Sequence, residues 1–258
     1  MTRLKVLMAL FLIGMVLTGV VLAYIVKGYY EDGKEAESIR EIAYGTVSVD
    51  QAKEPVSPGT AAEDAEDEGV TIDFASLKEI NSDTIGWLRA CGGEIDGPVV
   101  QTTDNSFYLD HRFDGSSGSV GCFFADAELP DGLNAPLTVV YGHNRKDGSM
   151  FHPLLNYKDE KYFSDHPTFE VWTEDEEVTY RVFSAFFADN NVVYGDAFMD
   201  VVMQGGEGDE LQKLFEEAKE KSLYDAGEEL KLDEMVILST CEYSGDNNRM
   251  VVFGVRVR

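Results

Sequence analysis

The sequence predicts a mainly β domain, a closed or nearly closed barrel of about eight short strands, behind an N-terminal membrane-spanning helix. Three observations support this fold class. Positions 6–26 carry no charge, residues 31–69 lose all hydrophobic periodicity, and the remainder alternates short apolar, β-branched runs with Gly, Asp and Asn turns. Nearly 190 residues follow position 70, which is enough for one domain with a substantial core.

The uncharged stretch at 6–26 has 21 residues, which as a helix with a rise of about 1.5 Å per residue spans a bilayer core of roughly 30 Å. A cleaved signal peptide is the alternative interpretation, but the stretch exceeds the usual apolar core of about 7–15 residues. Arg3 and Lys5 precede the stretch and no acidic residue occurs before Glu31. The positive-inside rule therefore predicts a cytoplasmic tail at 1–5 and export of everything after the helix.

Residues 27–70 are expected to form an acidic extracellular linker, with helix at most near 35–43, because this composition buries too little to offset ordering entropy. The folded domain is then residues 71–258. The formal net charge of the chain is −27, and a surface of this sign repels nucleic acid, so we predict no nucleic-acid partner.

The domain is expected to open with a short helix, because Phe74, Leu77 and Ile80 would share one face of it. Asp73, just before them, can cap this helix. Helical inserts are predicted at 150–157 and at 209–224, the second followed by Gly227 as C-cap. The strands are expected at 85–90, 99–101, 121–125, 138–142, 169–173, 178–188, 235–240 and 250–257.

A cysteine acyl-transfer site is indicated by three strand ends. Cys241 ends the strand at 235–240, His143 ends the strand at 138–142, and Arg249 opens the last strand. Acyl transfer needs a thiolate nucleophile, an acid for the leaving amine, and a donor for the developing oxyanion. These three residue types fill those roles, and Arg keeps its charge at every relevant pH. Free Cys and His titrate near 8.5 and 6.5, so only a minority of molecules hold thiolate and imidazolium together, and we expect a slow enzyme.

The remaining cysteines and histidines are assigned ordinary roles. Cys122 lies in a strand-like run and is expected in the core, whereas Cys91 precedes two glycines and could be exposed; a disulfide between them stays open. No cofactor is predicted, and the other histidines lack metal-ligand spacing: His111, His152 and His166.

These residues resemble the sortases, membrane-anchored cysteine transpeptidases of Gram-positive bacteria, and class B in particular. Leu-Ser-Thr-Cys at 238–241 is similar to the Thr-Leu-x-Thr-Cys signature of the family, with Ile237 where Thr is usual. The resemblance covers roughly 74–258, and the helix at 209–224 lies where class B carries an extra helix. Further segments that match in order and spacing are 81–88, 98–101, 104–105, 108–109, 140–144 and 147–151.

The resemblance implies a closed eight-stranded barrel with an N-terminal helix and an inserted helix between late strands. It also implies that Cys241 attacks the Thr carbonyl of a C-terminal sorting signal, His143 protonates the leaving amine, and Arg249 stabilises the oxyanion. The partners would be surface proteins that bear sorting signals and an amine of a peptidoglycan precursor or cross-bridge, with the enzyme single-pass in the cell membrane. The positions that match substrate-groove residues are Asn105, Leu109, Ser239 and Glu242, and less securely Asn190 and Tyr194.

Two other functions remain open from the sequence. A papain-like cell-wall cysteine peptidase also pairs Cys with His, but its nucleophile normally opens a helix and precedes the His, whereas here His143 precedes Cys241. A non-catalytic, membrane-tethered binding module fits the acidic linker and the extreme charge. The reactivity of the Cys241 thiol separates these alternatives from acyl transfer.

Overall fold

The computed structural model describes residues 2–45, 70–129, 131–189, 208–227, 230–241 and 248–257. The chain divides into two units, Met1–Glu41 and Ile42–Arg258. The three predicted residues that lie outside the described ranges are Asn190, Tyr194 and Glu242.

Helix α1 (Thr2–Ala43) runs through the predicted membrane span and on through residues 27–43. Among the described residues it is the one helix that is long and apolar enough to cross a membrane, over Leu10–Ala43. Its apolar side chains, such as Phe11 and Val16, are exposed within the structure, as a lipid-facing helix requires.

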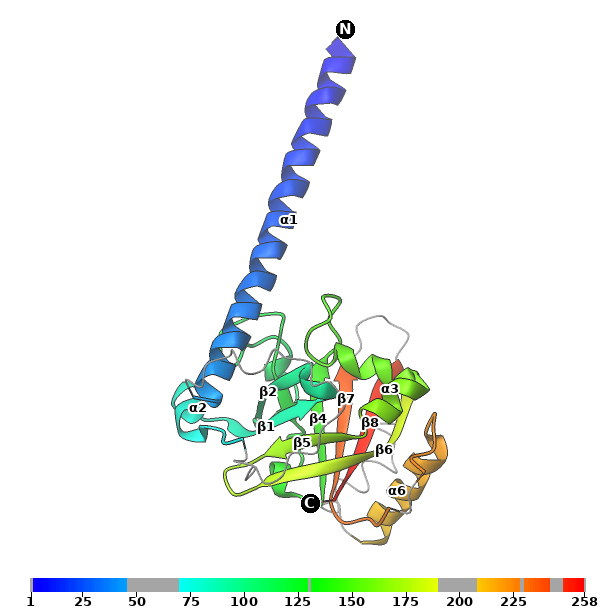
Figure 1. Cartoon of the computed structure of the whole chain (residues 1–258). Helices are drawn as coiled ribbons and strands as arrows, with labels where there is room; N and C mark the ends of the chain where they lie inside the picture. Colours follow the sequence, from blue (N-terminus) through cyan, green and yellow to red (C-terminus); the bar gives the residue numbers. More distant parts are fainter. Residues whose placement is uncertain are drawn as a thin grey trace, which may run out of the picture. The chain divides into compact units, whose positions relative to one another are not determined.

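The second unit contains a closed barrel with the strand order β1-β2-β3-β4-β7-β8-β6-β5 (Figure 1). This confirms the predicted eight-stranded barrel. The strands are β1 (Thr84–Ala90), β2 (Ile95–Val100), β3 (Phe123–Ala125), β4 (Leu137–His143), β5 (Thr168–Trp172), β6 (Glu177–Asp189), β7 (Met235–Cys241) and β8 (Asn248–Arg256).

Strand alternation separates an inner and an outer face of the barrel. Val140, Leu238 and Val252 belong to the interior core. Their neighbours along each strand therefore point outward, among them Tyr141 and Ser239. All seven residues of β4 are buried, so its outer face is covered as well as its inner face.

Short helices precede or connect the strands of the barrel. In α2 (Phe74–Ile80), the side chain of Asp73 accepts the Ser76 N–H at 3.0 Å, which confirms the predicted cap. The predicted helix at 150–157 is a 3-10 helix, His152–Lys158, and α3 (Glu160–Asp165) is an addition that the sequence did not indicate.

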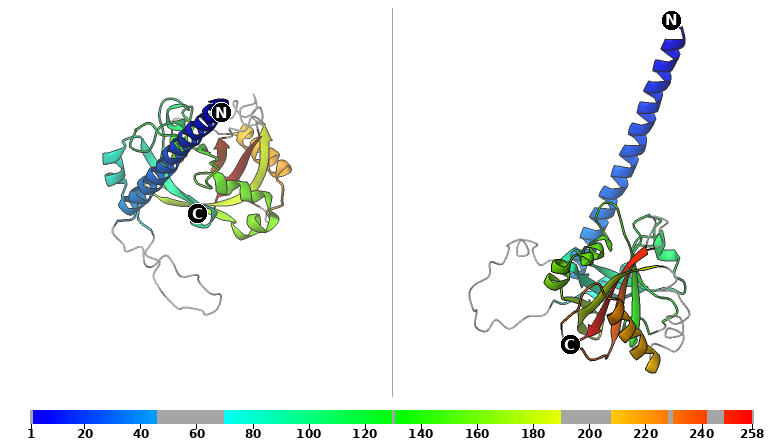
Figure 2. Two further views of the ribbon diagram at one scale, coloured as in Figure 1. Left: turned by 90° about the horizontal axis from the view of Figure 1, so that it is seen from above. Right: turned by 90° about the vertical axis from the view of Figure 1, so that its right-hand side faces the viewer.

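Helix α6 (Asp209–Lys221) is inserted between β6 and β7 and lies beside β6 (Figures 1 and 2). Its buried face includes Leu211, Phe215 and Ala218, as predicted. The prediction that Gly227 caps it is wrong, because the helix ends at Ser222. Beyond that point the Leu223 N–H pairs with the Ala185 carbonyl of β6 at 2.9 Å instead of continuing the helix.

The first residues of the second unit, at the end of α1, contact the barrel. The Tyr44 hydroxyl donates to Asp96 Oδ1 at 2.5 Å, and Trp87 Nε1 donates to the same oxygen at 2.8 Å. The Asp73 N–H donates to the Ala43 carbonyl at 2.8 Å. Tyr44 is therefore part of the packing around the fully buried Trp87, and their rings meet edge to face at 5.6 Å.

Candidate active site

The backbone brings the three predicted catalytic residues to neighbouring strand ends. Strands β4 and β7 are parallel, with His143 directly opposite Cys241. Strands β7 and β8 are antiparallel, with Ser239 opposite Val251, so continuing this register by two residues sets Cys241 opposite Arg249. Arg249 also pairs with Ala188 of β6. Residues 98 positions apart in the sequence, His143 and Cys241, thus become neighbours.

Two of these residues, His143 and Arg249, fall on the outer face of the barrel. They alternate with the interior-facing positions of β4 and β8. His143 is buried even so, with 2% of its surface exposed, and Arg249 is half-buried. The covering segment on the His143 side is residues 104–121, as the following contacts show.

A backbone carbonyl fixes the His143 ring. The distance from His143 Nε2 to the Leu109 carbonyl oxygen is 2.6 Å. Because a carbonyl oxygen only accepts hydrogen bonds, Nε2 carries a hydrogen. Nδ1 is then the ring nitrogen that can gain and lose a proton.

The surroundings of His143 favour its neutral form. Burial lowers the pKa of the imidazole, the Leu109 carbonyl raises it, and the positive charge of Arg145 lowers it further, for a net decrease from the ordinary value. Arg145 is itself buried and forms an ion pair with Asp147 at 2.9 Å. The imidazolium is therefore scarcer at neutral pH than it would be in a free histidine.

The segment that carries Leu109 is held at several points. Asp104 Oδ1 accepts the Ser106 and Phe107 N–H groups at 2.7 and 2.9 Å. The Tyr108 hydroxyl donates to Asp83 at 2.8 Å, and the Tyr108 backbone carbonyl accepts the Cys122 N–H at 3.1 Å. The Leu109 carbonyl consequently meets His143 from a rigid backbone. Leu109 was predicted as a substrate contact, and the sequence offered no signal for this second, backbone role.

Besides Leu109, two predicted groove residues lie in the described ranges. Asn105 is half-buried, and its Nδ2 donates to Asp126 Oδ1 at 3.1 Å while its Oδ1 accepts the Ala127 N–H at 2.8 Å. Ser239 is fully buried on the outer face, opposite Tyr141, and its hydroxyl has no hydrogen-bond partner among the described residues. Asn105 and Ser239 thus lie on the side of the barrel that carries His143.

The other two cysteines are separate buried thiols, so no disulfide joins Cys91 to Cys122. The sequence left open that Cys91 is exposed, and the structure shows that it is not: its exposed fraction is 1%, because Tyr157 and Phe163 pack into the same core cluster. Burial raises the pKa of the Cys91 thiol to about 12, which makes it unreactive at neutral pH. Cys122 is buried as predicted.

The other histidines bond within their own loops. His111 Nδ1 lies 2.8 Å from the Phe107 carbonyl, and His152 Nδ1 lies 2.8 Å from Asn144 Oδ1. In the described part of the chain, no group of three or more His, Cys, Asp or Glu side chains is arranged to hold a metal ion.

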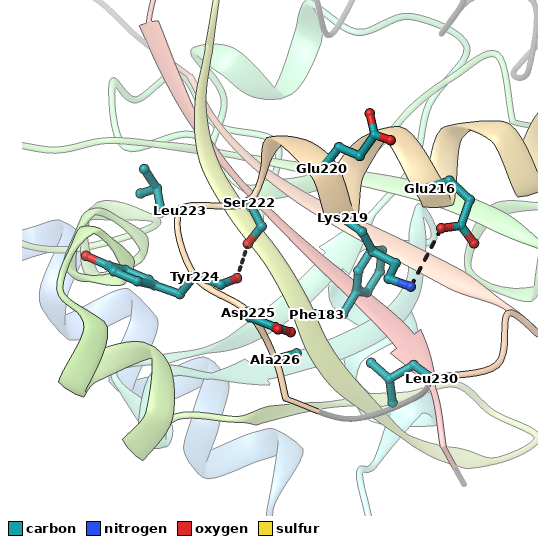
Figure 3. Close-up of a pocket in the computed structure, with 10 residues that line it drawn as sticks. All are labelled: Phe183, Glu216, Lys219, Glu220, Ser222, Leu223, Tyr224, Asp225, Ala226 and Leu230. Carbon is teal, nitrogen blue, oxygen red and sulfur yellow. Dashed lines mark hydrogen bonds and ion pairs between the residues drawn. The ribbon is translucent and has the colours of Figure 1, made fainter.

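A cavity of about 420 Å³ lies elsewhere, between the end of α6, residues 222–226 and β6 (Figure 3). Phe183 and an ion pair of Lys219 with Glu216 at 3.6 Å line it. None of the predicted site residues that the structure describes is among its lining residues.

The strand register sets a cysteine opposite a histidine and, by continuation, opposite an arginine at the ends of three strands of an eight-stranded barrel, and these are residue types that cysteine acyl transfer uses. Residues 93–257 match the Sortase domain family. The chain therefore belongs to the sortase family, whose members are cysteine transpeptidases.

Similar proteins and structures are sortases of class B. Sortase B of Listeria monocytogenes is 29% identical over 188 residues, 72% of this chain and 74% of the relative. Sortase B of Staphylococcus aureus is 30% identical over 190 residues, 72% of this chain and 75% of the relative. A crystal structure of sortase B from Bacillus anthracis in complex with AAEK2 superposes with a TM-score of 0.70 at 28% identity, covering 89% of this chain and 97% of that one. The class B assignment made from the motifs is thereby confirmed.

Proposed function

We propose that this transpeptidase cleaves a C-terminal sorting signal after Thr, holds the acyl group as a thioester on Cys241, and transfers it to a cell-wall amine. The observation that carries the proposal is the register that sets His143 opposite Cys241 at the end of two parallel strands. The resemblance of 238–241 and Arg249 to the family signature supports the same roles.

In the first half-reaction the Cys241 thiolate attacks the Thr carbonyl carbon, and the carbonyl oxygen becomes an oxyanion. The guanidinium of Arg249 stabilises that charge without exchanging protons with the Cys–His pair. His143 Nδ1 then gives its proton to the leaving amine, because Nε2 stays bonded to the Leu109 carbonyl. The C–N bond breaks and the thioester remains.

In the second half-reaction an acceptor amine attacks the thioester carbonyl. His143 Nδ1 takes the proton that the amine loses, and Cys241 leaves as the thiolate. The resting pair is thereby restored with no net oxidation or reduction. The lowered pKa of His143 makes the thiolate–imidazolium pair a minor species, which supports the expectation of a slow enzyme.

The proposed setting follows the charges of the N-terminus. Residues 1–5 would be cytoplasmic, 6–26 would span the cell membrane, 27–70 would link, and 71–258 would work outside, facing the wall. The partners would be surface proteins with sorting signals and a peptidoglycan amine. The substrate groove would include Asn105, Leu109, Ser239 and Glu242, with Asn190 and Tyr194.

The test is incubation of the full chain in detergent with Asn-Pro-x-Thr-like and Leu-Pro-x-Thr-Gly-like peptides plus candidate amines, read by mass spectrometry. The full chain is needed because removal of residues 1–70 takes Tyr44 away from Asp96 and Trp87. We expect cleavage after Thr, an adduct of the acyl fragment with one amine, and a thioester on Cys241.

Cys241→Ala is expected to abolish both products and leave the fold intact. Cys91→Ala is the matched control, because it also removes a thiol but one that is buried and unreactive. Activity of Cys241→Ala within tenfold of the wild type would rule out the assignment. Cleavage with water alone as acceptor, whatever amine is added, would identify a peptidase.

A further inference from the structure

Asp126 is a buried carboxylate that the reaction steps above do not use. It follows β3 directly, and 5% of its surface is exposed. Its side chain accepts three hydrogen bonds: from the Tyr141 hydroxyl to Oδ2 at 2.7 Å, and from Asn105 Nδ2 and the Glu128 N–H to Oδ1 at 3.1 and 2.9 Å. A buried carboxylate with this many donors is an organised site rather than a surface charge.

The position of Asp126 ties it to the active-site face. The Asp126 N–H donates to the Val139 carbonyl of β4 at 2.9 Å. Its partner Tyr141 lies two residues before His143 on the same strand, and therefore on the same outer face. Through Asn105, the carboxylate also reaches the start of the segment whose Leu109 carbonyl holds His143.

Asp126 determines how the Asn105 amide is oriented. The carboxylate accepts from Nδ2, while the Ala127 N–H donates to Oδ1. A rotation of the amide by 180° would set an oxygen against the carboxylate and an NH₂ group against the Ala127 N–H, so both hydrogen bonds would be lost. One orientation of the side chain is therefore fixed.

This orientation leaves the Asn105 amide one N–H and one oxygen lone pair beyond its two internal bonds. A half-buried amide with one donor and one acceptor to spare can pair with the carbonyl and the N–H of a peptide group. Fixing the amide in advance also removes the ordering entropy that a mobile side chain would lose on binding.

We propose that Asp126 is a positioning residue for substrate: it holds the Asn105 amide so that its remaining donor and acceptor meet a peptide group of the sorting signal. This inference rests on the proposed function, in which Asn105 belongs to the substrate groove. A purely structural Asp126 would instead support Tyr141 and the Glu128 loop without affecting peptide binding.

The test measures the affinity of the full chain, carrying Cys241→Ala to prevent turnover, for a fluorescein-labelled peptide by fluorescence anisotropy. The peptide is the Asn-Pro-x-Thr-like or Leu-Pro-x-Thr-Gly-like sequence that the wild-type chain cleaves fastest. Loss of one hydrogen bond to a peptide corresponds to about three- to tenfold in Kd. We expect Asn105→Ala and Asp126→Ala each to weaken binding by that factor, and the double variant to be no weaker than either.

Two control variants disturb the surroundings or the charge of Asp126 but keep the hydrogen bond between residue 126 and Asn105. Tyr141→Phe removes only the donor to Oδ2, and Asp126→Asn retains an oxygen toward Asn105 while its NH₂ faces the Tyr141 hydroxyl. Both are expected to bind within twofold of the parent. If Asp126→Ala does not fold, Asp126→Leu combined with Tyr141→Phe replaces both buried partners with apolar groups of similar shape and is compared with Tyr141→Phe alone.

The inference would be overturned if Asn105→Ala weakens binding but Asp126→Ala binds within twofold of the parent. The same holds if Asp126→Leu combined with Tyr141→Phe binds within twofold of Tyr141→Phe alone. Additive losses in the double variant would overturn it too, because independent effects add. An Asn105→Ala variant that binds like the parent would also contradict it. If the wild-type chain cleaves no peptide in the library, the proposed function itself fails, and that result is seen before any Asp126 variant is made.

Discussion

Gly121 lies where a single methyl group would test the geometry of His143. Its φ is +65°, and a Cβ built there would be 2.6 Å from the Tyr108 carbonyl oxygen and 3.0–3.1 Å from the His143 ring atoms Cδ2 and Nε2. The Tyr108 carbonyl cannot easily move away, since it is bonded to the Cys122 N–H and is adjacent to the Leu109 carbonyl. Gly121→Ala therefore has to displace the His143 ring, the Leu109 carbonyl, or both.

The expected magnitude has two parts. The left-handed conformation costs a non-glycine residue about 1–2 kcal/mol, of which about 0.4–1 is offset by the lower entropy of the unfolded chain. Overpacking against backbone adds about 1–3 kcal/mol, so we expect Gly121→Ala to lose about 2–4 kcal/mol of unfolding free energy. A ring displaced by about 1 Å lowers kcat/KM by about 100-fold.

The assay is kcat/KM for the cleaved peptide beside urea unfolding of the same preparation. Gly115→Ala is the matched control, because Gly115 has a φ of +78° but nothing within 4 Å of an added Cβ. It should lose about 1 kcal/mol and keep activity within twofold. If the two alanine variants have the same kcat/KM, the activity does not depend on the contact between the His143 ring and the Leu109 carbonyl, and the prediction is wrong.

Two further predictions concern the titration of His143. Arg145→Gln removes a nearby positive charge, so the pKa of His143 rises and the acid limb of the pH profile of kcat/KM moves to higher pH. Asp147→Asn leaves the charge of Arg145 uncompensated, so the acid limb moves to lower pH. Shifts of the same sign in the two variants would refute this. The folded-state pKa of His143 is lowered, so the unfolded chain binds a proton at this histidine more tightly than the folded chain does. The free energy of unfolding that neutral His143 contributes is therefore fully present above about pH 6.5 and is lost as the pH falls toward the folded-state pKa. His143→Gln should therefore lose less unfolding free energy than the wild type between pH 7 and pH 5 in urea titrations, and an unchanged pH dependence would contradict it.

Much of the barrel is predictable because each strand is short, apolar and bounded by turn residues. The run at 235–240 indicated β7 and the run at 138–142 indicated β4 within one or two residues. β2 begins at Ile95 rather than near 99, because Pro98 lies opposite Trp87 within an antiparallel pair that the local pattern does not reveal. Pairing to a distant partner overrides local propensity at such positions.

For the candidate site, the proximity of three strand ends was predictable because their side chains have specific chemistry. Cys241, His143 and Arg249 offer a nucleophile, an acid and a cation, and the register brings their backbones together. The Leu109 carbonyl was not predictable, since every residue has a carbonyl and only folding decides which one meets His143. Asp126 resembles any other acidic turn residue until Tyr141 and Asn105 are brought to it.

The hydrogen bond between the Ala43 carbonyl and the Asp73 N–H has a consequence for the acidic segment between them. Ala43 and Asp73 meet, so the number of residues between them does not set the distance between these two positions. The entropy of bringing two chain positions together changes by only about 0.6 kcal/mol when the number of residues between them doubles. Insertions, deletions and charge changes between these positions should therefore cost this hydrogen bond little free energy.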